Sequence, residues 1–249
     1  GIVALGIGSA VLFGVATPLS KLLLRGLSQF QLAGLLYLGA GIAMLPFVIA
    51  RRRAGRRTRL DAKNALRLAA AVLAGGCLGP VLLLLGLTSA RASSVSLWLN
   101  LELAATAVLG SLFFRDHLDA SGWVGVGGAL LAGVLVTAGE GSAGVVPSLL
   151  VAGACVCWGL DNSLTALIDA LTPQETTFFK GVIAGSVNTT IGLLAATSLP
   201  AAGTGLTALA LGAAGRAPQR HRGAAREQCR LGGPVGAAHR PLRSPRLRL

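Results

Sequence analysis

The chain has 249 residues, of which 53% are hydrophobic and only 12% are charged. A soluble domain has roughly twice that charged fraction, so the composition excludes an ordinary soluble protein and predicts a polytopic membrane protein. The net charge of +13 is concentrated in two places, because residues 216–249 hold nine arginines against one acid and most of the remaining charge belongs to one loop.

Eight apolar segments follow one another along the chain. The first seven approach the roughly 20 residues that cross a bilayer, whereas the eighth has only about 12. In chain order they are residues 2–24, 30–50, 65–87, 94–114, 121–138, 147–168, 177–199 and 203–214. We therefore predict an all-α membrane fold with about seven to eight helices.

The loop after the second segment is strongly basic. Its cations are Arg51, Arg52, Arg53, Arg56, Arg57, Arg59, Lys63 and Arg67. Because positive loops stay in the cytoplasm, we expect a multi-pass protein of the plasma or inner membrane with a cytoplasmic N-terminus. Topology alone explains this loop, and we predict no nucleic-acid partner. Lys21 and Lys180 lie near segment ends, and we interpret both as side chains that reach the membrane interface.

The fourth segment carries one acid, Glu102, near its middle. A carboxylate at the bilayer midplane costs several kcal/mol unless it is paired, hydrated or protonated. Helical spacing places Trp98, Glu102 and Thr106 on one stripe. We interpret this stripe as the wall of a polar cavity that serves as a substrate or ion path. The alternative is an acid that only fixes helix packing through a hydrogen bond.

The sixth segment repeats part of the first. Residues 13–31 align without a gap over residues 158–176, which places Thr17 opposite Asn162. Five spans separate the copies, and an odd number inverts the second copy, as is common in secondary carriers. Trp158, Asp161 or Asn162, and Thr165 share a helix face. We predict that both copies direct polar side chains toward one central cavity, with interhelical hydrogen bonding as the alternative role.

Four stretches of the chain resemble the EamA-type branch of the drug/metabolite transporter superfamily. They are FGVATPLSK at 13–21, residues 92–136 with the NLE-bearing helix and the RDHLD loop, WGLDNSLT at 158–165, and FFKGVIAG at 178–185. The resemblance covers roughly residues 1–210. It implies ten helices in two inverted five-helix repeats, and the transport of small metabolites or drugs.

On this basis we expect a first repeat over residues 1–139 and a partial second repeat over 147–214. Residues 215–249 form a basic, low-complexity tail that we interpret as out-of-frame coding sequence rather than a segment for anionic lipid or nucleic acid. A truncated product without transport activity is therefore an alternative function, and we expect negligible transport from this 249-residue chain.

Motifs of soluble enzymes are missing from the sequence. It has no G-x-x-x-x-G-K-[ST] and no H-E-x-x-H, so we predict no ATP-driven step, no catalytic residue, no metal site and no cofactor. An intramembrane enzyme that uses Glu102 and Asp161, or a channel, would be the rival functions. The expected partners are the lipid bilayer and a small-molecule substrate, and the sequence leaves proton coupling and homodimer formation open.

Overall fold

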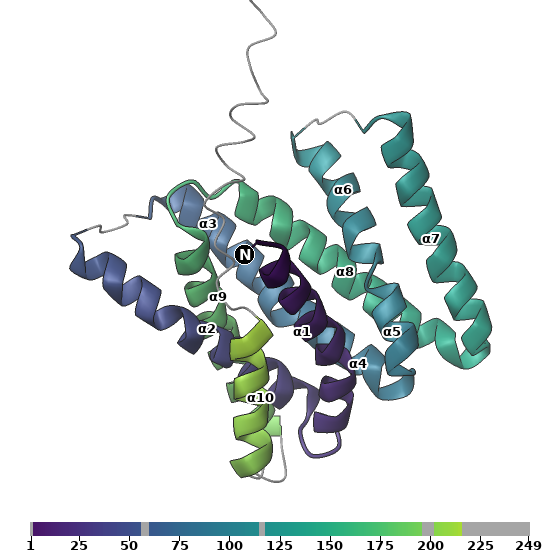
Figure 1. Cartoon of the computed structure of the whole chain (residues 1–249), viewed down its shortest axis with the longest axis horizontal. Coiled ribbons are helices and arrows are strands. Elements are labelled where there is room, and N and C mark those ends of the chain that lie inside the picture. The colour runs from purple at the N-terminus through teal and green to yellow at the C-terminus, as the bar shows by residue number, and fades with distance from the viewer. Residues whose placement is uncertain (1, 56–59, 115–117, 196–201, 216–249) are drawn as a thin grey trace, which may run out of the picture. The chain divides into compact units, whose positions relative to one another are not determined.

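The computed structural model describes residues 2–55, 60–114, 118–195 and 202–215, which are built from helices and short turns. The chain divides into two units, residues 1–218 and 219–249, and all described residues belong to the first. The basic tail at 216–249 therefore lies outside the described residues. The elements are α1 Ile2–Leu23, α2 Gln29–Arg53, α3 Ala62–Ala71, the π-helical segment η1 Val72–Leu78, α4 Gly79–Ser89, α5 Ala92–Trp98, α6 Leu101–Phe114, α7 Ala120–Glu140, the 3-10 turn η2 Ser142–Gly144, α8 Val145–Ala166, α9 Pro173–Ala195 and α10 Ala202–Gly215 (Figure 1).

Six helical stretches in the described part of the chain are long and apolar enough to cross a membrane. They are Gln29–Arg53, Ala62–Ser89, Ala92–Phe113, Ala120–Glu140, Ser142–Ala166 and Pro173–Ala195. Helix α1, with 22 residues, is not among these six, and α10 is shorter, with 14 residues. The prediction of an all-helical, polytopic membrane protein is confirmed.

Two of the predicted segments are interrupted rather than uniform helices. In the third segment, the π-helical segment η1 lies between the two α-helices α3 and α4. The fourth breaks at Leu99 and Asn100, where the Asn100 side chain donates a hydrogen bond to the Leu97 carbonyl at 3.0 Å. Asparagine competes in this way for backbone groups that a helix would otherwise use. The prediction of one continuous stripe across this segment is therefore wrong at the break.

Helices α2 and α9 pack against each other through small residues. The two helices run antiparallel, because Gly41 of α2 faces Gly181 of α9 and Leu38 faces Gly185. A Cβ atom on Gly181 would lie 2.6 Å from the Gly41 backbone nitrogen, so the backbones approach too closely for any larger residue. Small residues allow this approach in membrane helix pairs, so α2 and α9 pack backbone against backbone.

Both of these helices begin in the same way. Ser28 and Gln31 exchange hydrogen bonds at the start of α2, at 3.0 and 3.2 Å. Thr172 and Glu175 exchange the equivalent bonds at the start of α9, at 3.0 and 3.4 Å. Each pair satisfies two backbone N–H groups that a helix start leaves without partners. The two capping boxes are 144 residues apart, one fewer than the offset of 145 in the gapless alignment of 13–31 with 158–176, so the internal repeat and the division into domains at 1–139 and 147–214 stay predictions.

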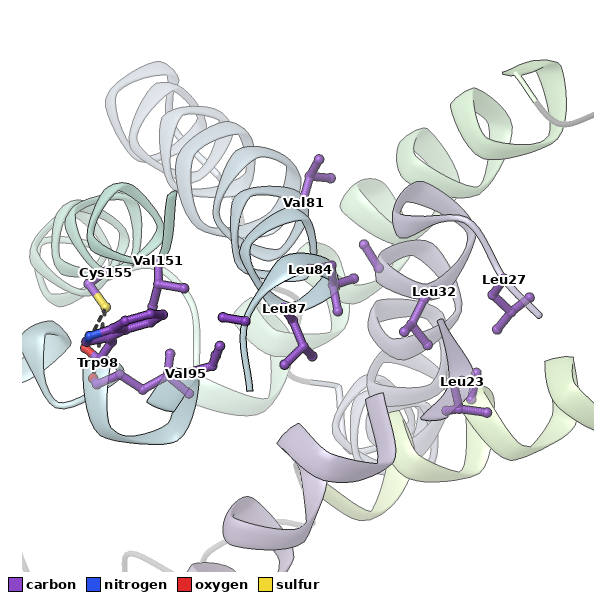
Figure 2. Close-up of a cluster of buried hydrophobic side chains, with 14 residues drawn as sticks. Leu23, Leu27, Leu32, Val81, Leu84, Leu87, Val95, Trp98, Val151 and Cys155 are labelled. Carbon is purple, nitrogen blue, oxygen red and sulfur yellow. Dashed lines mark hydrogen bonds between the residues drawn. The ribbon is translucent and has the colours of Figure 1, made fainter. Parts of the chain in front are cut away.

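The largest hydrophobic core lies where α4, α5 and α8 meet and extends to α1 and α2. Figure 2 shows Leu84 and Leu87 of α4 between the cluster around Trp98 and the cluster around Leu32. Helix α7, in contrast, has no buried residue and lies beside α6 (Figure 1). Its apolar surface is suited to lipid, and homodimer formation stays open.

Candidate functional site

A cavity of about 400 Å³ lies among α1, α2, α4, α6, α8, α9 and α10. Its walls are mainly leucine, but polar and charged side chains from five of these helices reach it. These are Thr17, Ser20, Tyr37, Glu102, Trp158, Asp161, Asn162 and Lys180. Five of the seven residues that the sequence analysis singled out line the cavity, and the two that do not are Thr106 and Trp98.

Glu102 lies at the start of α6 and is bonded across to α8. The Asn162 amide donates one hydrogen bond to Glu102 Oε1 and another to Thr106 Oγ1, both at 3.2 Å. Asn162 thereby joins two polar residues that are one helical turn apart. Thr106 does not line the cavity and is connected to it through Asn162.

Asp161 forms an ion pair with Lys180 on the opposite side of the cavity. The Lys180 ammonium lies 2.5 Å from Asp161 Oδ1 and 2.6 Å from the Thr165 hydroxyl, which in turn donates to Asp161 at 3.1 Å. Both charged side chains are almost fully buried. The interpretation of Lys180 as a side chain that reaches the interface is wrong, because its ammonium points into the bundle.

The π-helical segment η1 connects this pair to the rest of the site. The Gly75 carbonyl accepts hydrogen bonds from the Tyr37 hydroxyl at 2.6 Å and the Trp158 indole at 3.0 Å. The side chain of Asp161 lies against Gly75, where a Cβ atom would be only 2.5 Å from Asp161 Cγ. A π turn changes the backbone hydrogen-bond pattern and frequently marks a functional site. Here it presents one carbonyl to side chains from α2 and α8.

Trp98 does not line the cavity. Its side chain is fully buried in the hydrophobic core beside Val151 and Cys155, whose thiol donates to the Trp98 carbonyl at 3.7 Å (Figure 2). Its indole nitrogen has no hydrogen-bond partner among the described residues. The break at Leu99 and Asn100 lies between Trp98 and Glu102, so the helical spacing that predicted a common face does not apply.

Polar contacts join the helices at one end of the bundle. We name this the arginine end, and it consists of the C-terminal end of α2, the start of α3, the end of α8 and the start of α9. Arg51 pairs with Glu175 at 3.2 Å. Asn64 donates to Asp169 at 2.9 Å, and Arg67 donates to the Leu167 carbonyl at 2.5 Å. Each contact joins α2 or α3 to the turn between α8 and α9 or to the first turn of α9.

The Lys21 side chain also bonds to groups of the protein. It donates to the carbonyls of Leu87 and Ala90, at the C-terminal end of α4. A cation at this position satisfies carbonyl groups that have no partner within the helix and interacts favourably with the helix dipole.

Among the residues that the structure describes, no group of three or more His, Cys, Asp and Glu side chains could hold a metal ion.

Comparisons with known proteins found one matching family and one similar transporter. Residues 1–138 match the EamA-like transporter family. An uncharacterized transporter of Methanothermobacter thermautotrophicus is 27% identical over 193 residues, which cover 71% of this chain and 55% of that protein. The chain thus spans about half the length of this curated relative. No solved structure matches the chain.

Proposed function

Because the chain belongs to the EamA-like transporter family, we propose that it is a secondary carrier that moves small polar metabolites or drugs through the cavity among its helices. The observation that carries this proposal is the cavity itself, in which two acids and a lysine face one space inside an apolar bundle. Charged groups within membrane helices are costly and commonly mark substrate or ion paths. A cavity between related helices is where secondary carriers bind their substrates.

Within this carrier we propose that Glu102 couples transport to a proton gradient or binds a cationic group of the substrate. Its carboxylate lines the cavity and is held by the Asn162 amide at 3.2 Å. The amide carries no charge of its own, and the carboxyl group faces the cavity, where it can exchange a proton or meet a cationic substrate.

Substrate flux in proteoliposomes with an imposed pH gradient tests this role. Glu102→Gln keeps the shape and removes the titratable group, and we expect normal insertion with loss of pH-dependent flux. Glu140→Gln is the matched control, because Glu140 is paired with Arg91 at 2.8 Å and does not line the cavity. Unchanged flux and pH dependence in Glu102→Gln would assign Glu102 to packing. Absence of any flux from the parent protein would favour a product without transport activity.

We further propose a cytoplasmic N-terminus in the plasma or inner membrane. The support is Arg51, Arg52 and Arg53, which occupy the last turn of α2, since basic residues at helix ends favour the cytoplasmic side. A cysteine introduced at Ala54, in a background without the native cysteines, should resist membrane-impermeant reagents in intact cells and react after permeabilisation. Ready labelling of intact cells would reverse the orientation.

A further inference from the structure

Helix α1 contributes two hydroxyl groups to the wall of the cavity. Thr17 and Ser20 both line it, and their three-residue spacing places them on one face of the helix, one turn apart. Both residues are more than nine-tenths buried, with exposed fractions of 7% and 6%. The part of the wall that α1 provides is therefore polar, although it carries no charge.

The hydroxyls of Thr17 and Ser20 make no hydrogen bond to any other residue that the structure describes. Other hydroxyls inside the helices behave differently, since Ser111, Thr137 and Ser163 each donate to a backbone carbonyl three or four residues earlier, at 2.7, 2.8 and 2.9 Å. A local bond of this kind is common for serine and threonine within a helix. Thr17 and Ser20 lack it and face the cavity instead.

A buried hydroxyl group without a hydrogen-bond partner destabilises a fold, so two of them in one wall require an explanation. Pro18 lies between Thr17 and Ser20 and has no N–H group, so it cannot bond to the carbonyl four residues earlier in the helix. Interrupted helices commonly line the substrate sites of carriers. The two hydroxyls therefore lower stability at the point where a substrate could satisfy them.

The ionisable groups of the cavity come from other helices. Glu102 belongs to α6, Asp161 to α8 and Lys180 to α9, whereas α1 packs against α4, α5 and α10. Leucines of α4, among them Leu83 and Leu84, line the cavity as well. A small molecule in this space therefore meets ionisable groups from three helices, apolar side chains from α4 and neutral hydroxyls from α1.

We propose that Thr17 and Ser20 form a hydrogen-bonding subsite for a hydroxyl group of the substrate. This inference rests on the proposed function and deepens it, because it names a group that the substrate carries. A hydroxyl group both donates and accepts, as the side chains of serine and threonine do, so it can satisfy the two cavity hydroxyls together. A site built in this way rejects an analogue that lacks the group, since the polar atoms of the site are then left unpaired.

The experiment measures binding by calorimetry on the detergent-solubilised full chain, with pairs of probes in which a methyl group replaces one hydroxyl. The pairs are L-threonine and L-valine, choline and propyltrimethylammonium, and lactate and isobutyrate. They comprise a zwitterion, a cation and an anion, so the charge preference of the cavity does not decide the outcome. The parent protein should prefer the hydroxyl-bearing member of at least one pair by at least about tenfold.

The double variant Thr17→Val with Ser20→Ala removes both hydroxyls and nearly keeps the shape of the wall. It should bind the two members of that pair equally, and its Tm without ligand should stay the same or rise because two unpaired polar groups are gone. Ser163→Ala is the matched control, because Ser163 is buried and donates to the Gly159 carbonyl but does not line the cavity. This control should keep the hydroxyl preference of the parent.

Three results would overturn the inference: a parent protein without hydroxyl preference in any pair, a folded double variant that keeps the preference, or a double variant whose Tm falls clearly below that of Ser163→Ala. The last result would mean that the two hydroxyls stabilise the fold itself. Flux assays separate this inference from the carrier proposal. Hydroxyl preference without flux contradicts only the carrier, whereas equal flux of both members of every pair contradicts only the subsite.

Discussion

Gly75→Ala tests whether close contact between η1 and α8 maintains the site. An alanine Cβ at this position would lie 2.5 Å from the Cβ and Cγ atoms of Asp161, whereas carbon atoms pack best at about 3.5–4.0 Å. The overlap of roughly 1 Å must be relieved by moving α8 away from η1 or by turning Asp161 away from Lys180. Either change weakens the bond from Trp158 to the Gly75 carbonyl.

Overpacking of this kind costs about 1–3 kcal/mol, and the weakened interhelical hydrogen bond adds roughly 0.6–1.7 kcal/mol. The better helix propensity of alanine returns up to about 1 kcal/mol, so we expect a net loss of about 1–4 kcal/mol. At roughly 2–4 °C per kcal/mol, Tm should fall by about 2–16 °C. Cation binding should weaken as well, because the ion pair is displaced.

Gly125→Ala in α7 is the matched control. No atom lies within 4 Å of a Cβ at Gly125, so only helix propensity acts there, and Tm should stay the same or rise. Thermal unfolding of the purified protein in detergent measures both changes. If Gly75→Ala is as stable as Gly125→Ala and binds the organic cation benzyltrimethylammonium equally well, the close contact between Gly75 and Asp161 does not exist in solution.

Three further changes test other parts of the fold. Trp98→Phe should lower the free energy of unfolding only slightly because the indole N–H has no partner among the described residues, whereas Trp98→Ala should cost about 3–5 kcal/mol; denaturation curves compare the two. Glu175→Gln keeps the capping box but loses the ion pair with Arg51, so stability should change by less than about 1 kcal/mol, while a cysteine introduced at Ala54 should become more accessible to reagents. Asn188→Ala removes a hydrogen bond of 3.0 Å to the Gly76 carbonyl and should lower stability by about 1 kcal/mol. Asn188→Ser should be no more stable than Asn188→Ala, because its shorter side chain cannot reach the Gly76 carbonyl.

The sequence predicts the fold class and most of the polar residues that line the cavity for the same reason. Long apolar segments predict membrane helices, and any polar residue inside such a segment is costly enough to require an explanation. Glu102, Asp161, Asn162 and Thr17 all belong to that class, and all reach the cavity. What they do there is still a prediction, because position in a cavity does not establish a function.

Lys180 shows what the sequence could not predict. Helix α9 begins at Pro173, several residues before the apolar segment begins, because Glu175 belongs to its capping box. Lys180 therefore lies about two turns inside the helix rather than near its end. One feature of the sequence could have predicted the ion pair: Lys180 and Asp161 carry opposite charges on consecutive segments that are joined by a short turn. The distance between these two side chains depends on how α8 and α9 fold back on each other.

The polar contacts at the two ends of the bundle join different sets of helices. At the arginine end, Arg51 bonds to Glu175 in the first turn of α9, and Asn64 and Arg67 bond to the turn between α8 and α9. At the opposite end, Lys21 and Arg91 bond within α1–α7. Asn64 and Glu175 are buried, whereas Arg51 and Arg67 are partly exposed. The arginine end is therefore held across α2, α3, α8 and α9 by bonds that include buried polar groups, and such groups destabilise a fold most when they are left without a partner.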